Sequence, residues 1–214
     1  MQQQVDALRQ AAEREGLADS TLAKQLGDIR KLLDEAISPE LREQLAELKK
    51  ALADLDAPRT RDALQAMAQQ QQKTKDAIEQ ARELFKRAAL ETSLATMAQE
   101  AKRLADAQKD VAKQLGGRDS TASAAAERAL AKQADSLAAA LDRAAEKVPT
   151  AATKEGLQQA AQQARQAQQQ MQQAAQSASQ GDRKEAQQGG EQAQAKLDQL
   201  DQKIREERGE MQQQ

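Results

Sequence analysis

Apolar residues recur at spacings of three and four along nearly the whole chain, and no segment shows the strict alternation of a half-buried strand. The first pattern places apolar side chains on one face of an α-helix. Proline is well suited to the first turn of a helix, and glycine to the residue after its end. Such residues divide the pattern into six helices, with boundaries at Pro39, Pro58, Gly116–Gly117, Pro149 and Gly181. We therefore predict an all-α fold, an elongated antiparallel helical bundle with coiled-coil-like hairpins and no β-sheet.

Two groups of helices are expected. Residues 1–115 would form a helical hairpin or bundle around one long helix over about residues 58–115, on the order of 85 Å in length at the usual rise per residue. Residues 118–208 would form a thinner, Ala/Gln-rich three-helix unit or hairpin, and residues 209–214 a disordered tail. "GG" at Gly116–Gly117 is the expected domain boundary and hinge. The apolar stripe of the long helix shifts by two residues near Ala88–Leu90, which predicts a rotated stripe or a local change of winding.

The seams of the second and third helices carry large apolar residues at heptad spacing, the pattern by which helices pack against partner helices. The predicted helix-partner seam consists of Leu41, Leu45, Leu48, Leu52, Leu55, Leu90, Leu94, Met97, Leu104, Val111 and Leu115. Most large apolar residues precede Gly116, so we expect the C-terminal part to bury less surface and to be less stable.

The last two helices carry seams of small residues. One runs from Leu157 to Ala178 and is almost wholly alanine, and a matching stripe runs from Ala186 to Ile204. Small seam residues allow two helices to approach closely. The two stripes predict a close-packed antiparallel hairpin that turns at residues 179–181.

Composition narrows the possible chemistry. The 214 residues include 32 basic and 34 acidic ones, one phenylalanine, and no cysteine, histidine, tryptophan or tyrosine. Strong helix formers dominate. Disulfides, thiolate metal sites and nucleophile–histidine pairs are excluded. We expect no enzyme activity and no cofactor.

Other candidate sites are weak. Asp54 and Asp56 lack the glycine and closing glutamate of a calcium loop. Acids stand beside cations at helical spacing, as in Glu83 with Arg87 and Asp110 with Lys113, which is typical of solvated surface pairs. Basic and acidic residues are interleaved, which argues against a nucleic-acid partner. No run is long and apolar enough for a transmembrane segment in this chain, whereas weak membrane-surface binding stays open.

The segment "SPELREQLAELKKAL", followed by "RDALQAMAQQQQKTKDAIEQARELFKR" and "LADAQKDVAKQL", resembles the helical region of large bacterial cell-envelope proteins of domain of unknown function 4175. The resemblance covers roughly residues 30–115. It implies a parent protein with membrane helices and a place for this piece outside the inner membrane. It implies no activity and no functional residue.

These observations favour a non-catalytic structural or protein-interaction module, a spacer or scaffold of a larger bacterial protein. Its partners would be other helices, by self-association or in another protein. The alternative is an amphipathic coat on lipid or polymer granules, similar to phasins or apolipoproteins. The periplasm or cell envelope is the expected location on the resemblance, with the cytoplasm as the alternative.

Overall fold

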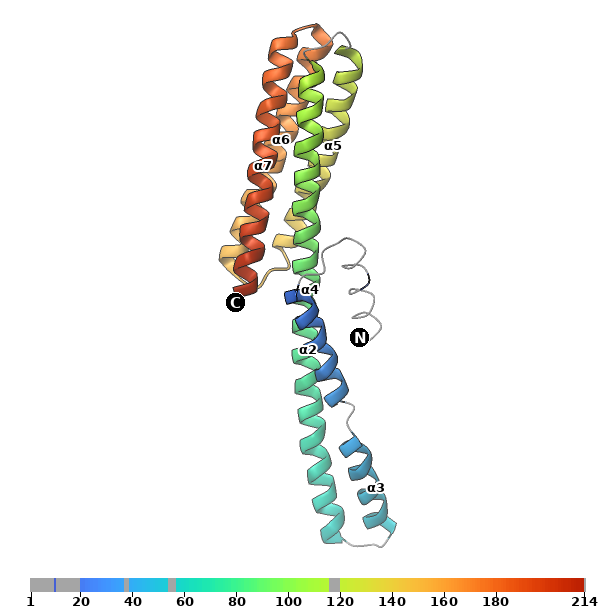
Figure 1. Cartoon of the computed structure of the whole chain (residues 1–214). Coiled ribbons are helices and arrows are strands. Elements are labelled where there is room, and N and C mark those ends of the chain that lie inside the picture. Colours follow the sequence, from blue (N-terminus) through green and yellow to red (C-terminus); the bar gives the residue numbers. More distant parts are fainter. Residues whose placement is uncertain (1–9, 11–19, 37–38, 54–56, 116–119, 214) are drawn as a thin grey trace. The chain divides into compact units, whose positions relative to one another are not determined.

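The computed structural model describes residue 10 and residues 20–36, 39–53, 57–115 and 120–213. They form six helices, which Figure 1 labels or colours along the chain. These are α2 (Ser20–Ala36), α3 (Pro39–Ala53), α4 (Ala57–Leu115), α5 (Ser120–Ala145), α6 (Ala151–Gln180) and α7 (Arg183–Gln213). No strand occurs in this described part of the chain, so the predicted all-α fold is confirmed.

The helix ends follow the local chemistry of the sequence. Both α3 and α4 have a proline in their first two residues, where its missing N–H leaves no hydrogen bond unmade. The end of α6 is a left-handed glycine, Gly181, with φ of 90°. There the N–H of Asp182 donates to the carbonyl of Ser177 at 2.9 Å. The predicted turn of the last hairpin is therefore confirmed.

Helix α7 continues to Gln213, with Met211 buried. The structure therefore corrects the expected disordered tail at residues 209–213. Met211 stands seven residues after Ile204 and extends the seam of this helix by two turns. That burial keeps the last turns of α7 packed.

The chain divides into two compact units, Met1–Ala89 and Leu90–Gln214. The division differs from the boundary expected at Gly116–Gly117 and lies within α4. It coincides with the shift of the apolar stripe near Ala88–Leu90. Before this point the stripe of α4 faces the first unit, and after it the stripe faces α5 and α7. The residues 116–119, including the proposed hinge, are outside the described part of the chain.

In the first unit, α2 packs on α4. Leu26 and Ile29 of α2 are buried against Ala81 and Ala88 of α4. Phe85 lies partly buried beside them, as its seam position predicts. Leu32 and Leu84 complete this small cluster.

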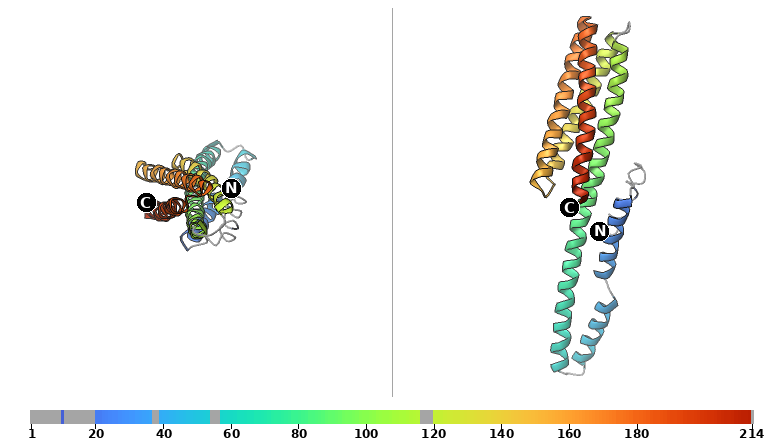
Figure 2. Two further views of the ribbon diagram at one scale, coloured as in Figure 1. Left: turned by 90° about the horizontal axis from the view of Figure 1, so that it is seen from above. Right: turned by 60° about the vertical axis from the view of Figure 1, so that its left-hand side comes forward.

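The second unit is a closed ring of four antiparallel helical segments: residues 90–115 of α4, then α5, α6 and α7. Each lies beside the next in the chain, as two views show (Figures 1 and 2). Polar contacts cross each of the four helix pairs, and the two that join α4 to α5, like the two that join α5 to α6, run in opposite directions along the two helices. They are Gln108–Glu127 and Arg103–Gln133 between α4 and α5, Arg128–Ser179 and Arg165–Asp142 between α5 and α6, Ser177–Glu185 between α6 and α7, and Lys102–Asp198 between α4 and α7.

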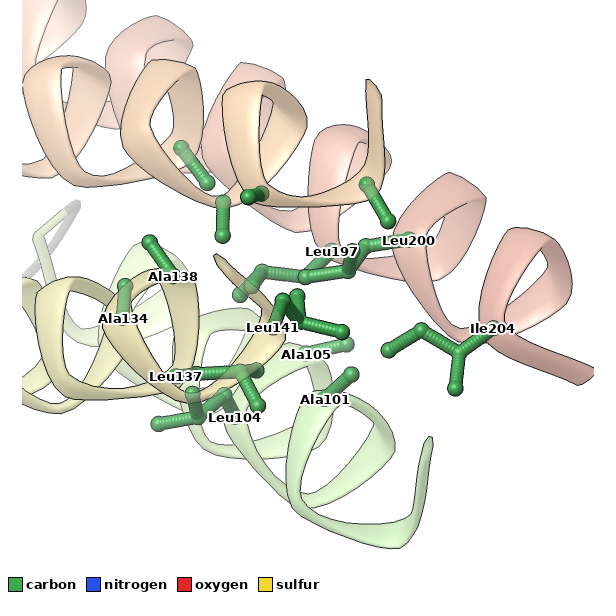
Figure 3. Packing of buried hydrophobic residues seen from close by; sticks show 14 of the residues in the cluster. Ala101, Leu104, Ala105, Ala134, Leu137, Ala138, Leu141, Leu197, Leu200 and Ile204 are labelled. Atoms are coloured by element: carbon green, nitrogen blue, oxygen red, sulfur yellow. The ribbon is translucent and has the colours of Figure 1, made fainter. Parts of the chain in front are cut away.

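The core of this ring mixes alanine with a few leucines. Figure 3 shows side chains that converge from α4, α5 and α7, among them Ala101, Leu104, Leu141 and Leu197. Every predicted seam residue of α6 and α7 is buried. Among the described residues, the main buried cluster thus lies in the second unit, against the expectation that the C-terminal part would bury less. The reason is that residues 90–115 bring their leucines to this unit, and that alanine seams bury the helix surface by close approach.

Candidate functional site

The α4 part of the predicted helix-partner seam lies in the core. Leu90, Leu94, Leu104 and Val111 are buried, and Met97 is partly buried against the same cluster. The helices α5 and α7 cover this stripe, so these residues are not available to another protein while the ring is closed. The side chain of Leu115 is outside the described part of the chain.

The α3 part of the seam is open where the structure describes it. Leu45 is 49% exposed and Leu48 is half-buried. The side chains of Leu41 and Leu52, and the whole of Leu55, are outside the described residues.

Two further large apolar side chains are exposed on α4 and were absent from the predicted seam. Leu64 is 50% exposed and Ile78 is 41% exposed. Ile78 follows Leu64 by two heptads, so both lie on one face of the helix. We call these two residues the Leu64–Ile78 stripe. Their heptad spacing was a signal in the sequence, but spacing does not tell whether a partner helix covers the stripe.

A polar pair is buried in the ring where α4, α5 and α7 meet. Gln108 of α4 donates from Nε2 to Oε1 of Glu127 on α5 at 2.7 Å, and both side chains are fully buried. Gly190 of α7 faces them, and a Cβ there would lie 3.0 Å from Gln108 Nε2 and 3.2 Å from Glu127 Oε1. The missing side chain of Gly190 therefore makes room for the pair.

The environment of this pair favours a neutral acid. Removal from water raises the pKa of Glu127 to about 7, and the hydrogen bond from Gln108 acts in the opposite, lowering direction. The other oxygens of the pair, Gln108 Oε1 and Glu127 Oε2, are buried without a hydrogen-bond partner. Buried polar atoms are normally paired, so two orphan oxygens side by side in one pair require an explanation.

Sequence reasoning missed this pair, although its signal was present. Glu127 continues the α5 seam of Ala124, Ala131 and Ala134, and Gln108 stands between Leu104 and Val111. Both polar residues thus occupy core positions of their helices. A seam defined by apolar residues alone passes over them.

A second buried acid lies at the other end of the α6–α7 hairpin. Glu207 is 3% exposed, and its Oε1 accepts from Lys203 Nζ at 2.9 Å. This hydrogen bond raises the pKa of Lys203. The carboxylate fills the space beside Gly156, where a Cβ would stand 1.8 Å from Glu207 Oε1. Here too a glycine of one helix accommodates a polar side chain of another.

The surface ion pairs are those of solvated helices. Asp110 and Lys113 pair at 3.4 Å as predicted, whereas Glu83 pairs with Lys86 at 2.6 Å. Such exposed pairs contribute little to stability. Among the described residues, no group of three or more acids could hold a metal ion. Asp54 and Asp56 lie outside these residues.

No protein-family model matches the chain, and no curated protein or solved structure shows significant similarity to it. None of the described helices has both the length and the apolar character that crossing a bilayer requires.

Proposed function

We propose that the chain is a non-catalytic structural or protein-interaction module, a spacer or scaffold of a larger bacterial protein, and that its first unit binds a partner helix. One observation supports this most directly. Within the described residues, the exposed large apolar side chains are Leu45, Leu64 and Ile78, all in the first unit. The seams of the second unit face one another across its core.

The Leu64–Ile78 stripe fits a helical partner. At 1.5 Å per residue its two side chains stand about 21 Å apart along α4, which is four turns of helix. A partner helix with apolar residues at heptad spacing would match both. Exposed Lys75 and Glu79 lie one turn or less from Ile78. Charges of both signs beside an apolar stripe select the register of a partner helix and add little affinity.

The cell envelope is the setting we propose for this partner. The resemblance of residues 30–115 to envelope proteins of domain of unknown function 4175 supports it, and the stripe lies within that range. On this proposal the second unit acts as a closed structural support, and the first unit carries the binding surface.

Site-specific photo-crosslinking tests the proposal. A crosslinkable residue placed at Leu64 or Ile78 is expected to give a discrete protein adduct in the native host, and the variant Leu64→Gln should reduce the adduct formed from position 78. Gln159, exposed on α6, is the matched control position and should give none. Equal yields at all three positions, or no adduct at any, would refute a partner at the stripe.

Analytical ultracentrifugation of the purified chain separates the two kinds of partner. A sedimentation coefficient that rises with protein concentration in the wild type, but not in a Leu64→Gln/Ile78→Gln variant, identifies a second copy of the chain as the partner. Sedimentation that is independent of concentration points to a different protein. A compact monomer with a low frictional ratio contradicts the elongated scaffold.

A further inference from the structure

The buried pair Gln108–Glu127 has an unusual set of hydrogen-bonding atoms. One bond joins Gln108 Nε2 to Glu127 Oε1, while Gln108 Oε1 and Glu127 Oε2 have no partner. An ionised carboxylate can only accept, and the amide oxygen of glutamine can only accept as well. With Glu127 ionised, the two remaining oxygens therefore cannot bond to each other, and each stays unsatisfied.

A proton on Glu127 changes this arrangement. The carboxylic acid gains one O–H donor, and the free oxygen of the amide beside it is an acceptor. We propose that the neutral carboxyl of Glu127 donates from Oε2 to Gln108 Oε1 while Gln108 Nε2 donates to Glu127 Oε1, forming a proton-controlled latch between α4 and α5, against which Gly190 of α7 packs. When the proton leaves to water, the second hydrogen bond is lost and a bare carboxylate remains in the core.

Other charged groups do not take over the role of the proton. The charged residues of the helices around the pair are exposed: Lys109, Asp110 and Lys113 on α4, Arg128 and Lys132 on α5, and Arg183, Lys184, Glu185 and Glu191 on α7. Residues 166–180, the end of α6 that lies beside this part of α5, contain no charged residue. No described cation therefore compensates a carboxylate at Glu127, and the small residue Gly190 is what seals the pair from α7.

The raised pKa of Glu127 determines how the stability of the ring changes with pH. The pKa of Glu127 is raised from an ordinary 4.5 to about 7 in the folded chain. The folded state therefore holds a proton that the unfolded state has released, and the ring loses stability as the pH rises toward and through 7. Deprotonation should loosen the contact between α4 and α5, which the pair joins, and the packing of α7 on the pair at Gly190. The latch is thus closed at mildly acidic pH and weakened at mildly alkaline pH.

The composition of the chain makes this effect easy to isolate. It contains neither histidine nor cysteine, so few other groups titrate between pH 5.5 and 8.5. Across that range we expect the unfolding equilibrium constant of the second unit to rise on the order of 30-fold through Glu127. The isosteric variant Glu127→Gln should lack this change, because a neutral amide can keep the paired hydrogen bonds at every pH. Asp135→Asn, which neutralises an exposed acid of the same helix, should retain it.

Two measurements on the full chain test the latch. Urea unfolding is followed from pH 5.5 to 8.5 together with hydrogen exchange of residues 101–115 and 183–195, corrected for the intrinsic rate at each pH. Loss of protection in both segments of the wild type, and not of Glu127→Gln, supports the proposal, whereas identical pH profiles of the two proteins would overturn it. Carboxyl carbon resonances of glutamate in the wild-type chain provide a readout that needs no variant. A single resonance titrating near neutrality is expected, and titration of every glutamate below pH 5.5 would also overturn the proposal.

Discussion

Gly190→Ala is the substitution that tests most directly how closely the ring is packed. The new Cβ would lie 3.0 Å from Gln108 Nε2, 3.1 Å from Ala112 Cβ and 3.2 Å from Glu127 Oε1. These distances are shorter than ordinary carbon contacts. Ala112 has no rotatable side chain that could move away, so α7 must shift relative to α4.

Two opposing effects determine the size of the change. Alanine is more favourable than glycine inside a helix by about 1 kcal/mol. Overpacking a well-filled core costs roughly 1–3 kcal/mol, and displacing the buried Gln108–Glu127 hydrogen bond adds roughly 1–3 kcal/mol because the groups left behind stay buried. We therefore expect Gly190→Ala to lower the free energy of unfolding by about 1–5 kcal/mol.

Gly209→Ala is the matched control, because Gly209 lies in the same helix and a Cβ there would meet nothing within 4 Å. It should raise the free energy of unfolding by up to about 1 kcal/mol. Urea unfolding followed by circular dichroism measures both variants. Hydrogen exchange then assigns the change to the second unit, since the chain contains two compact units.

The difference between the two variants removes the intrinsic helix preference and leaves the packing effect. A difference of about 2–6 kcal/mol agrees with the close approach of the helices around Gly190. If both variants are stabilised equally, Gly190 has room for a side chain, and the argument that it seals the buried pair is wrong.

Two further predictions concern the core and the last hairpin. Leu141→Ala should lower the free energy of unfolding, measured in urea, by about 2–5 kcal/mol because Leu141 is fully buried. The control Leu64→Ala, at a side chain that is 50% exposed, should change this free energy by less than about 1 kcal/mol. Equal losses in the two variants would contradict the assigned core. Gly181→Val should lower the free energy of unfolding by about 1–2 kcal/mol, seen as a lower Tm, because a φ of 90° is strained for a β-branched residue. Gly181→Asn should lower the Tm less, because asparagine tolerates this conformation. Equal Tm values for the two variants would contradict the left-handed turn.

Much of the local structure could be predicted from the sequence. The all-α fold, the start of α4 beside Pro58, the turn at Gly181 and the alanine seams of α6 and α7 all follow from helix periodicity and from the backbone preferences of proline and glycine. These features depend on residues close together in the chain. That is why a sequence pattern contains them.

The tertiary partners of each seam could not be predicted in the same way. Heptad spacing in α4 shows which face is apolar, but it does not show that the face after Leu90 packs against α5 and α7 while Leu64 stays exposed. The shift of the stripe near Ala88 was interpreted as a rotated stripe or a local change of winding, and in the structure it marks a change of the helices that the stripe contacts. Counting only large side chains also underestimated the second unit, because its core depends on close contacts between alanines.

The buried polar residues were the other omission. Glu127 and Gln108 occupy positions that the spacing of three and four residues assigns to the core. This spacing predicts their burial only if it is applied to polar as well as apolar residues. A charged or amide residue on an otherwise apolar seam is therefore worth recording as a candidate buried group. Whether such a residue finds a partner and enough space depends on the neighbouring helices. Here Gly190 of α7 leaves the space that the pair occupies.

The order of helices around the ring also affects how the second unit folds. Three of its four interfaces join segments that are consecutive in the chain, and only the contact between α4 and α7 closes over a long sequence separation. Proteins dominated by such local contacts fold quickly, because each hairpin forms without a large loss of chain entropy. We expect the three hairpins to form in succession, with the late docking of α7 on α4 as the step that closes four helical segments in a row into a bundle.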